Sequence, residues 1–221
     1  MSGRSTKRTN PRTRPSRGHS LKFPGDEIKA EVALLREIEQ RSHSEGRAYS
    51  VSPSTGTFLK ILAHCSSATR VLELGLGFGG SAIYLSKAIG SGARIDSIEL
   101  LHTHVVIATN YLKKAKVAHL VRIIEGDALT VMPKLSDSYD LIFLDTDLAI
   151  YPDCLSEMIR LTKLGGIIVS ENLWDRETAL ALVGEEGFLR IQDYVSQLFA
   201  ENRLLSTTLG DGLALSLKVM D

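Results

Sequence analysis

The sequence predicts an α/β fold: a seven-stranded, mostly parallel sheet with helices on both faces and an antiparallel hairpin at its C-terminal end. Three observations predict it. Short apolar runs alternate with helical stretches from about residue 70 onward. A glycine-rich turn follows the first run, and the last two runs flank Gly210-Asp211-Gly212. Strict alternation of strand and helix implies right-handed crossovers and a sheet covered on both faces.

Two helices are predicted before the first strand. Ile28, Val32 and Leu35 recur at helical spacing, and a second helix begins near Ser52-Pro53-Ser54 and ends near His64. The predicted parallel strands cover residues 70–75, 93–100, 121–127, 139–146 and 166–172. The helices between them cover residues 80–89, 103–115, 128–135 and 151–163. A long helix then precedes the hairpin strands at 204–209 and 213–219.

Composition limits the class of protein. The chain has 221 residues, of which 43% are hydrophobic and 24% charged, enough for one α/β core without disulfides or metal. Cys65 and Cys154 are too few for a disulfide framework. No apolar run approaches the ~20 residues that span a bilayer, and no secretory signal opens the sequence. We therefore expect a cytoplasmic protein with no membrane partner.

The formal net charge of zero hides an asymmetry. Residues 1–25 carry seven Lys or Arg residues and no acid, which leaves 19 basic and 26 acidic residues in the remainder, a net charge of −7. Residues 1–20 are rich in Ser, Thr, Arg and Pro, so we expect a disordered basic tail there and one domain over residues 21–221. By charge, only this tail could bind nucleic acid.

The glycine-rich turn indicates a nucleotide-type ligand. Gly75, Gly77 and Gly80 fit G-x-G-x-x-G between a strand and a helix, where absent side chains let the backbone approach a ligand. A tight turn alone explains one glycine, but not four within six residues. Glu99 ends the second strand 19 residues after Gly80, where an acid can accept both ribose hydroxyls. The alternative for Glu99 is a solvated acid.

Two acids distinguish between nucleotide ligands. A dinucleotide places its pyrophosphate on the helix N-terminus, where a nearby carboxylate is unfavourable. Glu73 lies two residues before Gly75 and favours a sulfonium ligand that carries an ammonium group. Asp127, in Gly126-Asp127-Ala128 at the end of the third strand, could meet an adenine. Asp127 could also cap the following helix, and the two roles are compatible.

These residues resemble the class I S-adenosylmethionine (SAM)-dependent methyltransferases, and most closely the catechol and caffeoyl-CoA O-methyltransferases with their small bacterial relatives. The resemblance extends from about residue 51 to the C-terminus. It is carried by residues 51–56, 71–75 with Ser81, 98–99, 126–127, 143–145 and 171–172. It implies a Rossmann-like fold, SAM as cofactor, methyl transfer to a hydroxyl oxygen of a small-molecule acceptor, and a homodimer.

The resemblance also implies roles for individual residues. The implied ligands of the methionine portion are Val51, Glu73, Gly75, Gly77 and Ser81. Glu99 is implied to bind the ribose, and Gly126, Asp127 and Ala128 the adenine. Asp145, the implied catalytic residue, would lie beneath the sulfonium. Together with Glu171 and Asn172 it would hold a divalent metal, and three oxygen donors suit Mg²⁺ or Ca²⁺.

Two positions depart from the family pattern. Leu148 stands where the family commonly has a lysine that assists proton removal, and Glu171 stands where it has Asp. The extra methylene moves the carboxylate by ~1.5 Å, which matters at metal–oxygen distances. The alternative is that these strand-end acids bind no metal and that Asn172 turns the chain.

Nearby histidines and aromatic residues are weaker candidates. His102 and His104 begin the helix after Glu99, and a solvated helix face is the expected role for both. Tyr151 and Trp174 are candidate walls of an aromatic acceptor site, with simple packing as the alternative.

Two other functions stay open. One is an RNA or protein methyltransferase that recruits its target through residues 1–20. The other is a non-catalytic SAM-binding protein, which Leu148 and Glu171 motivate. A nicotinamide-dependent oxidoreductase is disfavoured by Glu73 and by the terminal hairpin.

Overall fold

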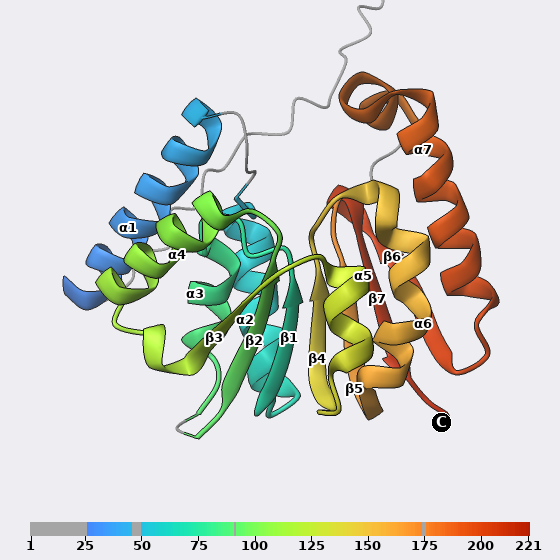
Figure 1. Cartoon of the computed structure of the whole chain (residues 1–221), viewed down its shortest axis with the longest axis horizontal. Coiled ribbons are helices and arrows are strands. Elements are labelled where there is room, and N and C mark those ends of the chain that lie inside the picture. Colours follow the sequence, from blue (N-terminus) through green and yellow to red (C-terminus); the bar gives the residue numbers. More distant parts are fainter. Residues whose placement is uncertain (1–25, 46–49, 91, 174–175) are drawn as a thin grey trace, which may run out of the picture.

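The computed structural model describes residues 26–45, 50–90, 92–173 and 176–221. The basic tail and Trp174 therefore lie outside the described residues. A single sheet runs through the middle of the molecule (Figure 1) in the order β3-β2-β1-β4-β5-β7-β6. The strands are β1 Arg70–Leu74, β2 Arg94–Glu99, β3 Val121–Glu125, β4 Tyr139–Leu144, β5 Thr162–Ser170, β6 Leu204–Leu209 and β7 Leu213–Lys218.

Strand directions confirm the predicted sheet. The first five strands pair in parallel, and β7 pairs antiparallel with both β5 and β6. The chain moves outward in one direction from β1 to β2 and β3, and in the other direction from β4 to β5. The carboxyl ends of β1 and β4 therefore border the point at which the strand order reverses, where α/β sheets bind ligands.

Helices cover both faces of the sheet (Figure 1). They are α1 Asp26–Glu45, α2 Pro53–Cys65, α3 Gly80–Ser86, α4 His102–Lys114, α5 Ala128–Val131, α6 Tyr151–Leu161 and α7 Arg176–Ala200. Single 3₁₀ turns lie at Ala118–Leu120, Met132–Lys134, Leu148–Ile150 and Gly210–Gly212. Within the described ranges, no helix is long and apolar enough to cross a membrane.

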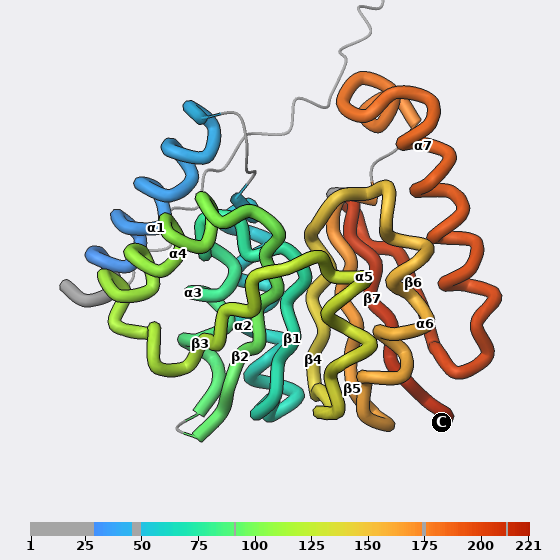
Figure 2. The backbone as a smooth tube through the Cα atoms, viewed as in Figure 1, coloured from blue at the N-terminus to red at the C-terminus, as the bar shows by residue number. Residues whose placement is uncertain are grey.

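The start of β5, the form of the hairpin turn and the course of the long helix differ from the predicted ones. β5 begins at Thr162, four residues early, because the chain leaves α6 directly into the strand and its pairing with β4 shifts register beyond Tyr139. The hairpin turn is a 3₁₀ turn over Gly210–Gly212. The long helix is kinked at Gly184, whose φ of 71° and ψ of −173° are not helical. The kink separates α7 into two halves, and Figure 2 shows the path of the backbone through them.

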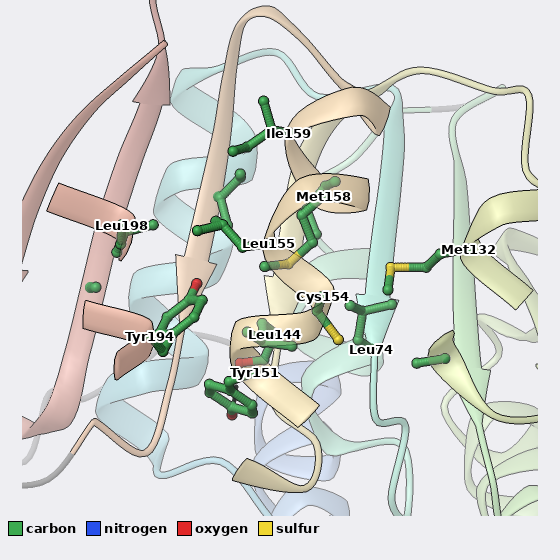
Figure 3. Packing of buried hydrophobic residues seen from close by; sticks show 14 of the residues in the cluster. Leu74, Met132, Leu144, Tyr151, Cys154, Leu155, Met158, Ile159, Tyr194 and Leu198 are labelled. Carbon is green, nitrogen blue, oxygen red and sulfur yellow. Dashed lines mark hydrogen bonds between the residues drawn. The ribbon is translucent and has the colours of Figure 1, made fainter. Parts of the chain in front are cut away.

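Alternating side chains build a core on each face of the sheet. Leu72 and Ile142 pack with α5, α6 and α7, whereas Val71 and Leu141 pack with α2 and α3. Cys154 of α6 is fully buried on the first of these faces, and Figure 3 shows it beside Leu74 and Leu144. α1 joins a third cluster together with α3 and α4.

The amino ends of the strands carry a network around one buried acid. Asp96 is fully buried, and Arg122 donates to its two carboxylate oxygens at 2.8 and 2.9 Å. The Tyr139 hydroxyl also donates to Asp96, at 2.8 Å, and Arg94 Nε lies 3.0 Å from it. This network ties β2, β3 and β4 together at the end of the sheet opposite the glycine-rich turn.

Candidate active site

The glycine-rich turn leaves β1 in a conformation that requires glycine. Gly75 has a φ of 92°, and a Cβ atom there would collide with the carbonyl oxygen of Asp145. The backbone N–H of Gly75 donates to Ile98 O at 2.9 Å, and that of Asp145 donates to Leu74 O at 2.9 Å. The turn is therefore fixed against the ends of both neighbouring strands, β2 and β4.

A cavity of about 490 Å³ lies at this turn. Its volume is within the ~300–1,000 Å³ of small-molecule sites. The predicted site residues that line it are Val51, Gly75, Gly77, Ser81, Glu99, Asp145 and Asn172. Asp147 adds a third carboxylate, and no Lys or Arg is among the described residues of the lining. The cavity therefore favours a cationic ligand.

Glu99 is held rigidly at the edge of this cavity. Its Oε2 accepts from the backbone N–H of Gly77 at 2.8 Å, and its Oε1 accepts from that of Leu101 at 2.9 Å. The side chain is only 7% exposed. Glu99 is therefore a buried carboxylate fixed by the glycine-rich turn, and the alternative of a solvated acid is wrong.

Glu73 lies beneath the cavity and is absent from its lining. It is fully buried and accepts from the Ser81 hydroxyl at 2.5 Å and from the Ser97 hydroxyl. Burial, with a smaller contribution from the charge of Glu99, raises the pKa of Glu73 to about 7 against the two hydroxyl hydrogen bonds, which lower it. Ser81 does line the cavity, so the Ser81 hydroxyl links buried Glu73 to the cavity.

The segment predicted to meet the adenine lies away from the cavity lining. Asp127 caps α5, because its Oδ1 accepts from the backbone N–H of Leu129 at 3.1 Å. Gly126 N donates to Glu99 O at 2.9 Å, and Ala128 is buried in the core. The predicted cap is thus confirmed, while the predicted adenine contact of these three residues stays a prediction.

Three polar residues meet at the ends of β4 and β5. Asn172 Nδ2 donates to Asp145 Oδ1 at 2.7 Å, and Asn172 has a φ of 65°, so it also turns the chain. Burial and the neighbouring charge of Glu171 raise the pKa of Asp145 well above its ordinary value. Burial raises the pKa of Glu171 to about 7, against a hydrogen bond from Thr55. The two carboxylates therefore share one weakly solvated region.

This group of three has the chemistry of a hard-cation site. Glu171 Oε2 is buried and has no hydrogen-bond partner among the described residues. Asp145 and Asn172 line the cavity, whereas Glu171 is absent from the described lining but lies close enough for its charge to act on Asp145. No group of three or more His, Cys, Asp and Glu side chains in the described ranges is arranged to hold a metal. The candidate donors are instead two carboxylates, of Asp145 and Glu171, and the side-chain amide of Asn172. Oxygen donors of this kind suit an oxygen-preferring ion.

Tyr151 does not wall an acceptor site. Its side chain is fully buried, and its ring meets Tyr194 edge-on at 5.4 Å between centroids (Figure 3). Its hydroxyl donates to Glu171 O at 3.1 Å and lies 3.4 Å from Leu144 O. Tyr151 therefore packs in the core and joins the ends of β4 and β5 beneath the polar group.

Sequence reasoning missed part of the site. His104 was expected on a solvated face, yet it is buried, lines the cavity and lies 3.4 Å from Glu99 Oε1. Its ring packs edge-on against Phe78, which also lines the cavity. His102, by contrast, is exposed and pairs with Glu125 at 3.0 Å. The spacing of two residues, which puts the two histidines on different sides of the helix, was the signal that could have separated them.

The fold, with its antiparallel last strand, and the acidic cavity at the reversal of strand order define a Rossmann-like methyltransferase architecture. The sequence profile of the O-methyltransferase family matches residues 26–219. The chain belongs to this O-methyltransferase family.

Individual proteins agree with this assignment. A catechol O-methyltransferase of Niastella koreensis is 31% identical over 145 residues, covering 64% of this chain and 66% of that protein, just under two thirds of its length. The O-methyltransferase of tomaymycin synthesis from Streptomyces achromogenes, solved with SAM, superposes with a TM-score of 0.77 at 26% identity, over 85% of this chain and 90% of that chain. An O-methyltransferase from Bacillus cereus in complex with SAH has a TM-score of 0.76 at 26% identity, over 89% and 92%.

Proposed function

We propose that this protein is a SAM-dependent methyltransferase that acts on a hydroxyl oxygen of a small molecule. The observation that carries the proposal is the acidic cavity at the glycine-rich turn. Its lining includes the carboxylates of Glu99, Asp145 and Asp147, and His104 is the only His, Lys or Arg among the described lining residues. SAM carries a sulfonium and an ammonium group, so this charge matches it. Two structural neighbours were solved with SAM or SAH.

Each part of the cavity suits one part of SAM. Glu99 would accept from the ribose hydroxyls, since its carboxylate is already oriented by Gly77 and Leu101. Ser81, held by Glu73, would meet the methionine portion together with Val51 and the backbone of Gly75. Asp145 would lie near the sulfonium and stabilise its charge. When bound, SAM supplies the methyl group, and its sulfur keeps the electron pair of the broken bond.

We infer further that Asp145, Glu171 and Asn172 hold a divalent cation. Glu171 Oε2 is buried with no hydrogen-bond partner among the described residues, and Asp145 is a buried carboxyl group beside the charge of Glu171. A cation would satisfy the Oε2 atom and offset this charge. Such an ion lowers the pKa of a bound hydroxyl. Leu148 is buried where the family commonly has a lysine, so this side chain cannot take the proton of the hydroxyl.

The proposal includes a homodimer. β6 is the edge strand of the sheet, and its residues Leu204–Leu209 include neither a charged residue nor proline to block pairing with another chain. Leu205 is 67% exposed, and its register partner Leu217 on β7 is 37% exposed. A second copy that covers this edge would bury both leucines.

Calorimetric titration of the full chain with SAM and SAH tests the central claim. We expect both to bind, and Glu99→Ala to weaken SAH binding by about 10- to 100-fold, because ribose hydroxyls lose a charged acceptor. Glu125→Ala is the matched control, since Glu125 is the register partner of Glu99 at the end of β3 but pairs with exposed His102.

The control should bind SAH within about twofold of the unchanged protein, which corresponds to less than ~0.5 kcal/mol. Melting temperatures show whether Glu99→Ala remains folded. Absence of SAM and SAH binding at millimolar ligand would overturn the proposed function. Binding without methyl transfer to any catechol, flavonoid or other hydroxylated metabolite, with and without Mg²⁺, would instead identify a non-catalytic SAM-binding protein.

A further inference from the structure

His104 is a buried side chain of the acidic cavity to which the proposed function gives no role. It lies in the first turn of α4, where its backbone N–H donates to Leu101 O at 2.9 Å. Its imidazole is buried and lines the cavity beside Glu99. Because a buried polar group is costly unless it has hydrogen-bond partners, the surroundings of the two ring nitrogens indicate what this residue does.

Two contacts fix the position of the His104 ring. Its Nδ1 lies 3.4 Å from Glu99 Oε1. A carboxylate oxygen only accepts hydrogen bonds, so this contact is attractive when Nδ1 carries the proton. The Phe78 ring of the glycine-rich turn packs edge-on against the imidazole, with 5.3 Å between ring centres and 88° between ring planes. Arg41 of α1 in turn holds Phe78, because its guanidinium lies 5.5 Å from the centre of that ring.

Most of the acceptor sites of Glu99 already face protein donors. A carboxylate offers about four acceptor sites, two on each oxygen. The N–H of Gly77 takes one site on Oε2, and the N–H of Leu101 takes one on Oε1. His104 Nδ1 lies at the same Oε1. Both sites of Oε1 therefore face protein donors, whereas Oε2 keeps one open site.

The ribose of SAM has two neighbouring hydroxyls, at its 2′ and 3′ carbons. One of them can donate to the open site of Glu99 Oε2, so the other needs a second partner in the cavity. With the proton of the imidazole on Nδ1, the second ring nitrogen, Nε2, is an acceptor, and a hydroxyl is a donor. His104 thus has the chemistry that the remaining hydroxyl requires.

We propose that His104 is a ribose-binding residue: Glu99 Oε2 binds one hydroxyl of the cofactor ribose, and His104 Nε2 binds the other. The inference rests on the proposed function and adds a specificity-determining residue to it. The two hydroxyls are then recognised separately, one by a carboxylate and the other by an imidazole that Phe78 holds in place.

The test pairs the loss of a ligand hydroxyl with the loss of a protein side chain. SAH, 2′-deoxy-SAH and 3′-deoxy-SAH are titrated by calorimetry into the unchanged chain, His104→Phe and Glu99→Ala. His104→Phe keeps a ring against Phe78 and removes both nitrogens. In the unchanged chain, loss of the hydroxyl at His104 should weaken binding about fivefold. Loss of the hydroxyl at Glu99 should weaken it by at least about tenfold, because hydrogen bonds to charged groups are stronger.

The variants should divide the two hydroxyls between the two side chains. In His104→Phe, one deoxy compound should bind as tightly as SAH, because the side chain that recognises the missing hydroxyl is gone. In Glu99→Ala, the other deoxy compound should do so. His102→Phe is the matched control: His102 lies in the same turn of α4 and also contacts a glutamate, Glu125, but is exposed. This control should reproduce the ratios of the unchanged chain.

His104→Gln provides a second variant of the same position. Its amide can still bond a hydroxyl, so it should lower the contribution of that hydroxyl without abolishing it. Melting temperatures show which variants are folded, and where His104→Phe is not, the same comparison is made with His104→Gln.

Two kinds of failure are distinguishable in this experiment. If SAH does not bind the unchanged chain, the proposed function fails. If SAH binds, the inference is overturned when the His104 variant discriminates against both deoxy compounds as strongly as the unchanged chain does. It is also overturned when the same hydroxyl loses its contribution in the His104 variant and in Glu99→Ala, since the two side chains would then recognise one hydroxyl together.

Discussion

The carbonyl oxygen of Asp145 occupies the space that a side chain on Gly75 would need. The residue that follows β1 and the residue that follows β4 are therefore packed backbone against backbone, at the point where the strand order reverses. This close approach sets the floor of the acidic cavity. It brings the Asp145 carboxylate to the same cavity as the glycine-rich turn, so residues from two strand ends together form this part of the lining.

Gly75→Ala should therefore abolish SAH binding. The new methyl group would collide with Asp145 O and would also be strained at a φ of 92°. Calorimetry measures the affinity and thermal unfolding measures the stability, which we expect to fall by about 2–4 kcal/mol. Gly90→Ala, at a glycine with nothing within 4 Å of the added methyl, is the control and should bind normally. An alanine variant at position 75 with unchanged affinity would contradict this geometry.

Glu73→Gln should change the pH dependence of stability. The folded state holds the proton of Glu73 up to about pH 7, whereas an ordinary glutamate loses it near 4.5. The folded state therefore binds more protons across this window, and the free energy of unfolding falls as pH rises from 4.5 to 7. Glu73→Gln has no carboxyl group to ionise at this position. Between pH 4.5 and 7 its free energy of unfolding should therefore fall by about 2 kcal/mol less than that of the unchanged chain.

Urea unfolding at pH 4.5, 6 and 8 measures this slope. Glu201→Gln gives a contrast of opposite sign, because the hydrogen bonds from Arg203 lower the pKa of Glu201 to about 2. Its contribution to stability is present above the ordinary glutamate pKa and is lost as pH falls towards 2. Parallel pH profiles for the unchanged chain and Glu73→Gln would show that Glu73 ionises normally.

Mg²⁺ should bind to the SAH complex and should raise its melting temperature. Glu171→Gln keeps the size of the side chain but removes a charge, so we expect it to weaken Mg²⁺ binding by at least about tenfold while SAH binding changes little. Glu125→Gln, an exposed acid outside the cavity, should leave both unchanged. If Mg²⁺ produced neither heat nor a melting shift in the unchanged chain, the cation site would be refuted.

Deletion of residues 1–20 should leave small-molecule methylation unchanged, because every described residue of the cavity lining lies between residues 42 and 183. The same deletion should abolish any salt-dependent binding of RNA, since it removes six of the seven basic residues that precede residue 26. Filter binding at two salt concentrations and turnover of the small-molecule acceptor measure the two effects. Loss of turnover on deletion would favour the tail-dependent RNA or protein methyltransferase.

Leu205→Glu should convert a dimer into a monomer. The substitution places a charge on the edge strand, which would be buried unpaired in an interface that covers β6. Light scattering after size exclusion gives the mass directly. Ile61→Glu, which also replaces an exposed apolar residue, is the control on α2 and should stay dimeric. A monomeric unchanged chain would refute the proposed dimer.

The sheet could be predicted because its strands read as short apolar runs separated by helical stretches and glycine turns. The start of β5 could not, because Gly165 and Gly166 look like a turn although the strand already begins at Thr162. Strand-end positions placed Glu99, Asp145 and Asn172 around one cavity. The burial of His104 depends on packing against Phe78, a contact between separate elements that periodicity does not encode. The hydrogen bond from Ser81 of α3 to Glu73 of β1 is likewise a contact between separate elements, which periodicity does not encode.

The buried Asp96 network lies at the end of the sheet away from the cavity. Strand association at this end thus depends on residues outside the lining of the acidic cavity, while the opposite rim is made of turns. Residues at that rim can therefore be exchanged without disturbing the hydrogen bonds that Asp96 accepts from Arg122 and Tyr139. Substitutions that change the substrate can therefore be confined to one end of the open sheet, while the other end keeps the fold stable.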